Sequence, residues 1–356
     1  MGEILGLGVT HYPGLYAQDK DMANLLRRTL AARSTPERAS DPRNWPVGMR
    51  EEWSDDGGAK AAHSHRERCF AAFRAVREKL DRFQPDFVLI FGDDQYENFV
   101  EDILPPFCLY ILEEIESRPF AVEADAAQAH TNIWNEGPAT AFRHRGHPQS
   151  ARFIANRLAD EGVHLPYAYR LRSRTGLAHA FINTLMYLDA GRAGFNYPVV
   201  PLHVNCYGGS LVRSQGGRLP LSETGADPDP PAPSAAACFD LGRALGRILG
   251  RSAWRVALIA SSSWSHAFLT SKNDWIYPDH ASDRARLHEL QEGRFAGWRD
   301  LSRRQLEDAG QHELLNWIAL AGAMTEVGHT AQIIDFIETY VMNSNKCFAS
   351  WEYNPS

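Results

Sequence analysis

Four strongly apolar runs restrict the fold of this chain more than any other feature. They cover residues 5–9, 87–91, 198–205 and 254–260. Short apolar runs of this kind are typical of strands that are buried on both faces of a sheet. Between them lie segments with the periodicity of amphipathic helices, for example residues 61–83. Strands that alternate with helices predict an α/β fold, with a central, mostly parallel or mixed sheet flanked by helices.

The chain is predicted to form one large domain, residues 1–356, with two long excursions. Its length would allow one domain or two, but no linker separates two halves. Residues 16–60 are polar and rich in Arg, Asp and Pro, and residues 207–233 are rich in Gly, Pro, Asp and Ser. Excursions of this length are usually functional lids or interaction segments. The C-terminal part is predicted to be helical at 282–307, 312–324 and 329–341, and to end in a short polar tail.

Charge and cysteine usage exclude several classes of partner. The net charge is −7 and the 37 Lys and Arg residues are scattered, which argues against nucleic acid and anionic membranes as partners. The five cysteines show no C-x-x-C spacing, as expected of reduced intracellular thiols. No apolar run reaches membrane-spanning length. We therefore expect a cytoplasmic protein with no membrane or nucleic-acid partner, and homo-oligomerisation stays open.

Polar side chains follow several of the predicted strands. His11 comes after the first apolar run, Asp93 after the second and His266 after the fourth. Ligands of open α/β sheets bind outside the carboxyl ends of the strands, so these side chains are candidates for one site. His179 and Glu313 stand near the starts of two predicted helices. The full candidate set is His11, His63, His65, Asp93, Asp94, Gln95, His179, His266 and Glu313.

Two interpretations of these residues compete. A single histidine after a strand is often an ordinary turn residue, and a carboxylate such as Glu313 in the first turn of a helix complements the helix dipole. The functional alternative is a metal site. Two histidines and one carboxylate around an open coordination face form the triad of non-haem Fe(II) oxygenases, and the remaining histidines could act as acids or bases.

Several short strings, in the same order, resemble one known family. Thr10-His11-Tyr-Pro is similar to a Ser-His-x-Pro string, and Ser263-Trp-Ser-His266 is similar to Gly-Met-Ser-His. The string that begins at Glu313, Glu-Leu-Leu-Asn-Trp, resembles a helix that carries a metal-binding glutamate. The family is that of the class III extradiol ring-cleavage dioxygenases, which includes the protocatechuate 4,5-dioxygenase β subunit.

The resemblance implies a function and a set of roles. The chain would be an Fe(II)-dependent extradiol dioxygenase, an oxidoreductase that uses O2 to open the ring of a small catecholic aromatic, with a carboxylated or methoxylated substrate expected. His11 and Glu313 would bind the iron. His266 would be the catalytic acid/base, and His179 would contact the substrate or bound oxygen.

One departure from the family pattern concerns the second predicted strand. The β subunit has Asn-Asp-His there and its histidine binds iron, whereas this chain has Asp93-Asp94-Gln95. The Asp-Asp-Gln form resembles the methylgallate-dioxygenase branch of the superfamily. We expect His65 to supply the missing metal ligand because it lies near the start of the helix predicted from residue 61. His63 is the second choice, and Gln95 as a direct oxygen ligand is the third.

Two other functions compete with this one. The first is an enzyme of the same fold that uses Zn(II) and acts on a non-catecholic substrate. The second is a non-catalytic binding protein that kept the fold and lost the second histidine ligand. The presence of both His179 and His266 favours the dioxygenase over the binding protein.

Overall fold

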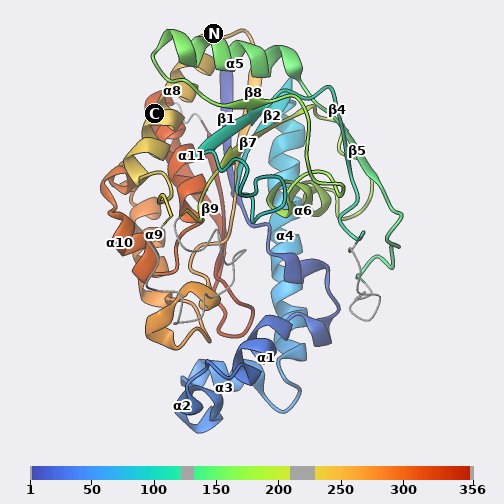
Figure 1. Cartoon of the computed structure of the whole chain (residues 1–356), viewed down its shortest axis with the longest axis vertical. Helices are drawn as coiled ribbons and strands as arrows, with labels where there is room; N and C mark the ends of the chain where they lie inside the picture. Colours follow the sequence, from blue (N-terminus) through green and yellow to red (C-terminus); the bar gives the residue numbers. More distant parts are fainter. Residues whose placement is uncertain (1, 122–131, 209–228, 353–356) are drawn as a thin grey trace.

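An eight-stranded sheet forms the centre of the computed structural model, which describes residues 2–121, 132–208 and 229–352 (Figure 1). The strand order is β6-β3-β7-β2-β8-β1-β10-β9. The four apolar runs form the adjacent strands β7 (Val199–Val204), β2 (Phe87–Gly92), β8 (Arg255–Ser261) and β1 (Glu3–Val9). These four are parallel to one another, while β3, β10 and β9 add antiparallel pairs. The α/β fold with a mixed sheet is therefore confirmed.

The other strands are shorter or lie nearer the edges of the sheets. They are β3 (Phe107–Tyr110), β6 (Tyr167–Ala168), β9 (Thr330–Ile337) and β10 (Lys346–Glu352). A separate two-stranded sheet pairs β4 (Glu114–Ser117) with β5 (Phe142–Arg145).

Helices cover both faces of the large sheet (Figure 1). One face carries α8 (Ala235–Gly250) and α11 (Leu314–Val327), which pack against each other, with α5 (Pro148–Asp160), α9 (His280–Gln291) and α10 (Arg303–Asp308) beside them. The other face carries α4 (Ala59–Phe83) and α6 (His179–Leu188). Each face has its own apolar core, so the central strands are buried on both sides.

The alternation of side chains along β1 explains how closely α11 approaches the sheet. Leu5, Leu7 and Val9 belong to the core on the α4 and α6 face. The opposite face of the strand carries Gly8, where an added Cβ would lie 2.1 Å from the ring of Trp317 in α11. The missing side chain leaves room for that ring, and α11 can begin close to the end of β1.

We expect Gly8→Ala to destabilise the protein by about 1–3 kcal/mol, the usual cost of overpacking a core. The indole of Trp317 would have to move to admit the new methyl group. Urea unfolding checks this, with Gly137→Ala as the control because a Cβ at Gly137 meets nothing within 4 Å. Equal midpoints for the two variants would contradict the close packing of α11 on β1.

The excursion at 16–60 is present and contains three short helices, α1 (Asn24–Ala31), α2 (Glu37–Ser40) and α3 (Val47–Trp53). They lie at the opposite end of the molecule from the N-terminus (Figure 1). Glu52 joins α3 to the body, because its carboxylate accepts hydrogen bonds from the Thr339 hydroxyl at 2.8 Å and the Tyr340 amide at 2.9 Å. Most of the second expected excursion, residues 209–228, lies outside the described residues.

The helix predicted at 329–341 is wrong, and so is the polar tail. Residues Thr330–Ile337 form β9, and the tail contains β10. Apolar residues such as Ile333, Ile334 and Ile337 have spacings that also suit a helix, but β9 pairs along its length with β10. The helix predicted at 282–307 is divided into α9 and α10. No helix of the described chain has both the length and the apolar character needed to cross a bilayer.

Candidate metal centre

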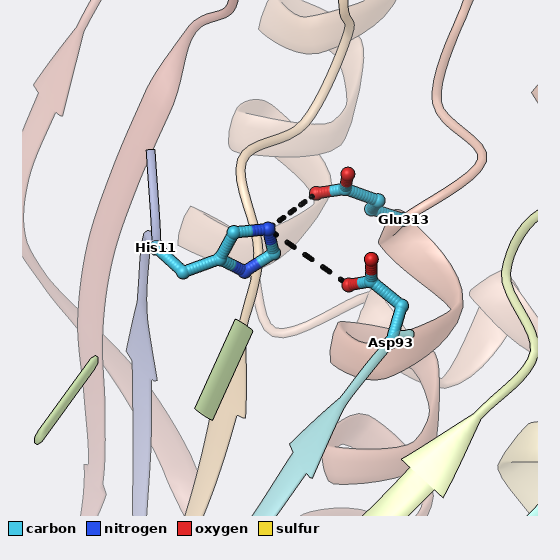
Figure 2. Close-up of side chains that lie close together, drawn as sticks. All are labelled: His11, Asp93 and Glu313. Carbon is cyan, nitrogen blue, oxygen red and sulfur yellow. Dashed lines mark ion pairs between the residues drawn. The ribbon is translucent and has the colours of Figure 1, made fainter. Parts of the chain in front are cut away.

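The carboxyl ends of β1, β2 and β8 lie side by side because these strands are adjacent and parallel. His11 follows β1, Asp93 follows β2, and Glu313 directly precedes α11. All three side chains are buried, and one potential ligand atom from each lies within 4.8 Å of the other two. His11 Nε2 is 3.4 Å from Glu313 Oε2 and 3.9 Å from Asp93 Oδ1 (Figure 2).

The backbone of β8 determines the tautomer of His11. The Nδ1–H group donates to the carbonyl oxygen of Ser261 at 3.0 Å, which leaves Nε2 without a proton in the neutral ring. Burial lowers the pKa of His11 well below its usual value, and the neighbouring His179 and His266 lower it further. A neutral imidazole with a free Nε2 is the form that binds metals.

The two carboxylates carry more negative charge than their surroundings neutralise. Burial raises the pKa of both, and the nearby Asp93 carboxylate raises the pKa of Glu313 further. Glu313 Oε1 accepts from the Tyr207 hydroxyl and from the Gln95 amide at 3.2 Å, whereas the buried Oε2 has no hydrogen-bond partner among the described residues. Asp93 Oδ1 accepts from the Asn316 amide at 3.3 Å.

These residues fit a divalent cation. Nε2 of His11, Oε2 of Glu313 and Oδ1 of Asp93 all present lone pairs toward one another, and within the described part of the chain no hydrogen-bond donor satisfies Oε2. Such a convergence is unfavourable without a proton or a positive ion between the atoms. Imidazole and carboxylate are ligands of Fe, Mn and Zn ions. The set of one histidine and two carboxylates differs from the two-histidine, one-carboxylate triad expected from the sequence.

His266 borders the same group. Its Nδ1–H donates to the carbonyl of Trp264 at 2.9 Å, and its Nε2 is 3.4 Å from Glu313 Oε2. Burial, together with the charge of Lys346, lowers the pKa of His266 to about 3. The ring is therefore neutral and presents an unprotonated Nε2 to the centre.

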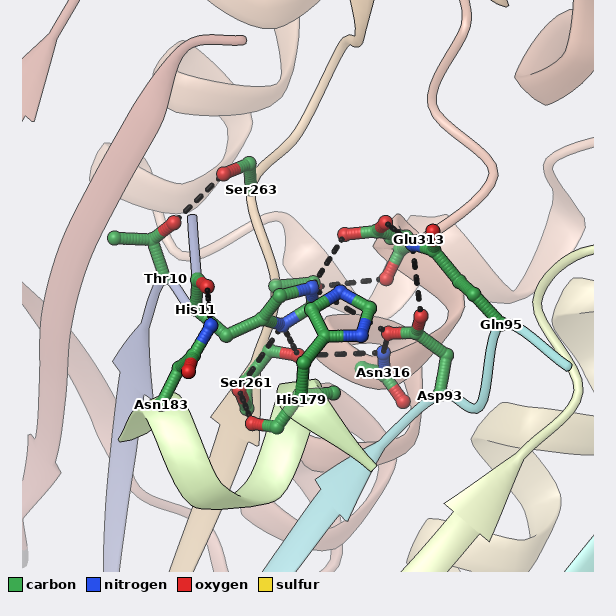
Figure 3. Close-up of polar contacts among 12 residues, drawn as sticks. Thr10, His11, Asp93, Gln95, His179, Asn183, Ser261, Ser263, Glu313 and Asn316 are labelled. Carbon is green, nitrogen blue, oxygen red and sulfur yellow. Dashed lines mark hydrogen bonds and ion pairs between the residues drawn. The ribbon is translucent and has the colours of Figure 1, made fainter. Parts of the chain in front are cut away.

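His179 lies on another side of the centre, at the start of α6 (Figure 3). Its ring packs edge-on against His11, with the centroids 5.0 Å apart. Its Nδ1 is 2.9 Å from Glu97 Oε2. Burial lowers the pKa of His179, but the Glu97 carboxylate, helped by Asp93 and Glu313, outweighs burial and raises it to about 9.

Asp283 joins the two loops that carry His266 and Glu313. This buried carboxylate accepts from the Ser265 amide at 3.1 Å and from the Gln311 side chain at 2.6 Å. Ser265 precedes His266 and Gln311 lies two residues before Glu313, so the carboxylate links the two loops.

The structure brings His11, His179, His266 and Glu313 together but not His65. His65 lies on α4, where its ring faces Tyr12, and His63 is exposed and pairs with Asp19 at 3.2 Å. Asp93 completes the group instead. The ring of His65 is buried and lies edge-on to Tyr12, with the centroids 6.4 Å apart, so it is occupied in the packing of α4. Gln95 directs its amide nitrogen toward the carboxylates and so acts as a donor, which differs from its expected role as an oxygen ligand.

Sequence patterns do not single out Glu97 or Tyr207 as site residues, and they give Asp93 as a candidate but not as an expected metal ligand. Glu97 lies in the same string as Asp93, directly after β2, and a charged residue at that position was an available signal. Tyr207 lies just after β7, the strand next to β2, where a hydroxyl can reach Glu313. No pattern in the sequence distinguished this tyrosine from the others.

Comparisons with known proteins match parts of this chain to one family and to named enzymes. Residues 229–343, which include His266 and Glu313, match the family model described as the catalytic LigB subunit of aromatic ring-opening dioxygenase. A 2,3-dihydroxyphenylpropionate/2,3-dihydroxicinnamic acid 1,2-dioxygenase of Paraburkholderia phymatum is 28% identical over 292 residues, 74% of this chain and 83% of the relative. An enzyme of the same name from Burkholderia vietnamiensis is 27% identical over 287 residues, with the same coverage.

Among solved structures, an uncharacterized protein from Escherichia coli K12 matches with a TM-score of 0.46 and 13% identity. The match covers 80% of this chain and 92% of that protein.

The family match and the named relatives indicate a ring-cleavage dioxygenase. The same matches support the resemblance to the class III extradiol dioxygenases that the short sequence strings indicate.

Proposed function

We propose that this chain is a non-haem Fe(II)-dependent extradiol dioxygenase that opens the ring of a catecholic aromatic with O2. The observation that carries the proposal is the convergence of His11 Nε2, Asp93 Oδ1 and the unpartnered Glu313 Oε2 at the carboxyl ends of the central strands. The family match and the names of the relatives support the choice of ring cleavage as the reaction.

In this proposal His11, Asp93 and Glu313 hold the metal. Gln95 and Tyr207 orient Glu313 by donating to Oε1, which leaves Oε2 for the metal. Hydrogen bonds that orient ligands in this way are a regular part of metal sites. Bound Fe(II) would supply a chelation point for the two catechol oxygens and for O2.

The histidines around the metal residues handle protons. His266 is neutral, its Nδ1–H is occupied by the Trp264 carbonyl, and its Nε2 faces the centre, so Nε2 is placed to accept a catechol proton and return it later. His179 holds its Nδ1 proton toward Glu97 and packs against His11, so the ring borders the space beside the metal ligands. Burial of His11, Asp93 and Glu313 excludes bulk water from their ligand atoms.

The substrate proposal is a small catechol with an acidic or methoxylated ring substituent. The relatives are named for 2,3-dihydroxyphenylpropionate and 2,3-dihydroxicinnamic acid. The Asp93-Asp94-Gln95 string favours a methylgallate-type ring instead. Both are catechols, so the two suggestions share the vicinal hydroxyl pair and differ only in the substituents.

We further propose one catalytic domain that acts in the cytoplasm. The five buried cysteines are all free, which fits a reducing compartment. The strands that build the centre come from both ends of the chain, since β1 lies between β8 and β10 in one sheet.

Oxygen uptake by the iron-loaded protein tests the proposed function. The panel should contain 2,3-dihydroxyphenylpropionate, protocatechuate, gallate and methylated gallates, with resorcinol as a control that lacks adjacent hydroxyls. We expect uptake of one O2 for each ring opened with at least one of the catechols. Turnover of a substrate by zinc-loaded protein without O2 uptake would favour the zinc enzyme, and binding of catechols without turnover would favour the binding protein.

We expect Asp93→Asn to lower iron retention strongly and His65→Ala to leave it unchanged. An amide is a weaker ligand than a carboxylate and brings no charge, whereas the ring of His65 faces Tyr12 outside the group. Iron content after desalting measures the effect, with circular dichroism to confirm folding. Loss of iron from His65→Ala, with full retention by Asp93→Asn, would restore the assignment expected from the sequence.

A further inference from the structure

The six residues after β2, Asp93-Asp-Gln-Tyr-Glu-Asn98, build more of the centre than the metal ligand alone. Asp94 accepts from the amides of Glu97 at 2.8 Å and Asn98 at 2.9 Å, so it holds the turn in one conformation. Tyr96 adopts a positive φ of 66°, which bends the backbone between Gln95 and Glu97. The turn thus directs Gln95 to the metal ligands and Glu97 to α6.

Glu97 holds His179 at two points. Oε1 accepts from the His179 backbone amide at 2.9 Å, and Oε2 lies 2.9 Å from Nδ1 of the same residue. The first contact satisfies a free N–H at the start of α6, and the second fixes the rotation of the ring and places the proton on Nδ1.

Asn98 holds the segment that leads into His179. Its side-chain oxygen accepts from the amides of Arg172 at 2.9 Å and Ser173 at 3.0 Å, and its side-chain nitrogen donates to the Gly176 carbonyl at 3.2 Å. Two adjacent residues of one turn therefore fix both the approach to α6 and the first side chain of this helix.

We propose that Glu97 is a positioning residue that acts through His179, so that the two form a carboxylate–histidine dyad beside the metal ligands. This inference rests on the proposed function, because ring cleavage is the reaction that the dyad would serve. The nearest precedent in physical terms is the orienting carboxylate of other histidine-based active sites, which fixes tautomer and ring orientation. The two hydrogen bonds that the Glu97 carboxylate accepts both come from His179, so Glu97 acts on the centre through that residue.

A double-mutant cycle with Glu97→Gln and His179→Gln tests the dyad. Glutamine keeps an oxygen that can accept from the backbone amide but removes the negative charge opposite Nδ1. We expect Glu97→Gln to lower kcat about 10- to 100-fold, the range for losing a carboxylate that orients a histidine, with iron content unchanged. The double variant should be no slower than His179→Gln alone, because residues that act as a unit are not additive.

Glu101→Gln is the matched control, since Glu101 is an exposed carboxylate four residues further along the chain. It should retain wild-type kcat. A multiplicative loss in the double variant, or a kcat for Glu97→Gln equal to that of the control, would overturn the dyad.

A second readout needs no turnover. In metal-free protein with ¹⁵N-labelled histidine, the ring-nitrogen signals of His179 are identified by their loss in His179→Gln. We expect Glu97→Gln to shift these signals and Glu101→Gln to leave them in place. If wild-type protein opens no catechol ring, the proposed function fails while this measurement still decides the dyad, and unchanged His179 signals in Glu97→Gln would contradict it.

Discussion

Replacing either His11 or Glu313 by alanine is expected to lower iron affinity by at least about 100-fold while leaving the protein folded. Each residue supplies one of three converging ligand atoms. In metal sites, mutation of a residue that only hydrogen-bonds to a ligand already lowers metal affinity about 10–100-fold, so loss of a ligand itself should cost at least as much. Iron content after desalting, measured together with the melting temperature, checks both parts of the expectation. His63→Ala is the matched control because His63 is exposed and lies outside the group.

Glu313→Ala has a second expected consequence for the metal-free protein. Burial and the neighbouring Asp93 carboxylate raise the pKa of Glu313, so the charged form is unfavourable in the folded state. Removing this group lifts that penalty but leaves the Tyr207 hydroxyl and the Gln95 amide without their acceptor, so the two effects oppose each other in the metal-free protein. Relative to wild type, the melting temperature should therefore fall more in the presence of iron than in its absence. Stoichiometric iron in both alanine variants would show that the metal residues are assigned wrongly.

His266→Phe is expected to keep iron and bind catechol but turn over about 100-fold more slowly, the usual scale for losing a general acid/base. The Nε2 atom of His266 faces Glu313 Oε2 at 3.4 Å, and phenylalanine has no atom that can accept a proton there.

A purely structural His266 would give a different result. The Trp264 carbonyl would lose its donor, which costs roughly 1–3 kcal/mol of stability, while turnover would change little. Melting temperature, iron content and single-turnover rate on one preparation separate the two cases. Near wild-type turnover in a stable, iron-loaded variant would remove His266 from the mechanism.

The central strands and two of the three proposed metal ligands, His11 and Glu313, are predictable from local sequence. Each apolar run is long enough to be a buried strand, and His11 lies two residues after the end of β1. Glu313 stands at the start of an apolar helical pattern in the sequence, and in the structure it directly precedes α11. Such features depend on a few consecutive residues, which is why sequence reasoning could reach them.

The remaining features depend on contacts between distant segments. β9 has a local pattern that also suits a helix, and only its pairing with β10, whose own neighbour is β1, makes it a strand. The choice between His65 and Asp93 depends in the same way on which of the two side chains lies near His11 and Glu313 in the folded chain. The sequence showed both residues as candidates but held no information on this distance.

The position of bound iron is the most direct test of the proposed metal centre. Crystals of iron-loaded protein, measured on either side of the iron absorption edge, give a map in which only iron produces an anomalous difference. We predict one peak in contact with His11 Nε2, Asp93 and Glu313. This peak should lie next to the rings of His179 and His266. A peak beside His65, or no ordered iron near Glu313 in protein that retains the metal, would contradict it.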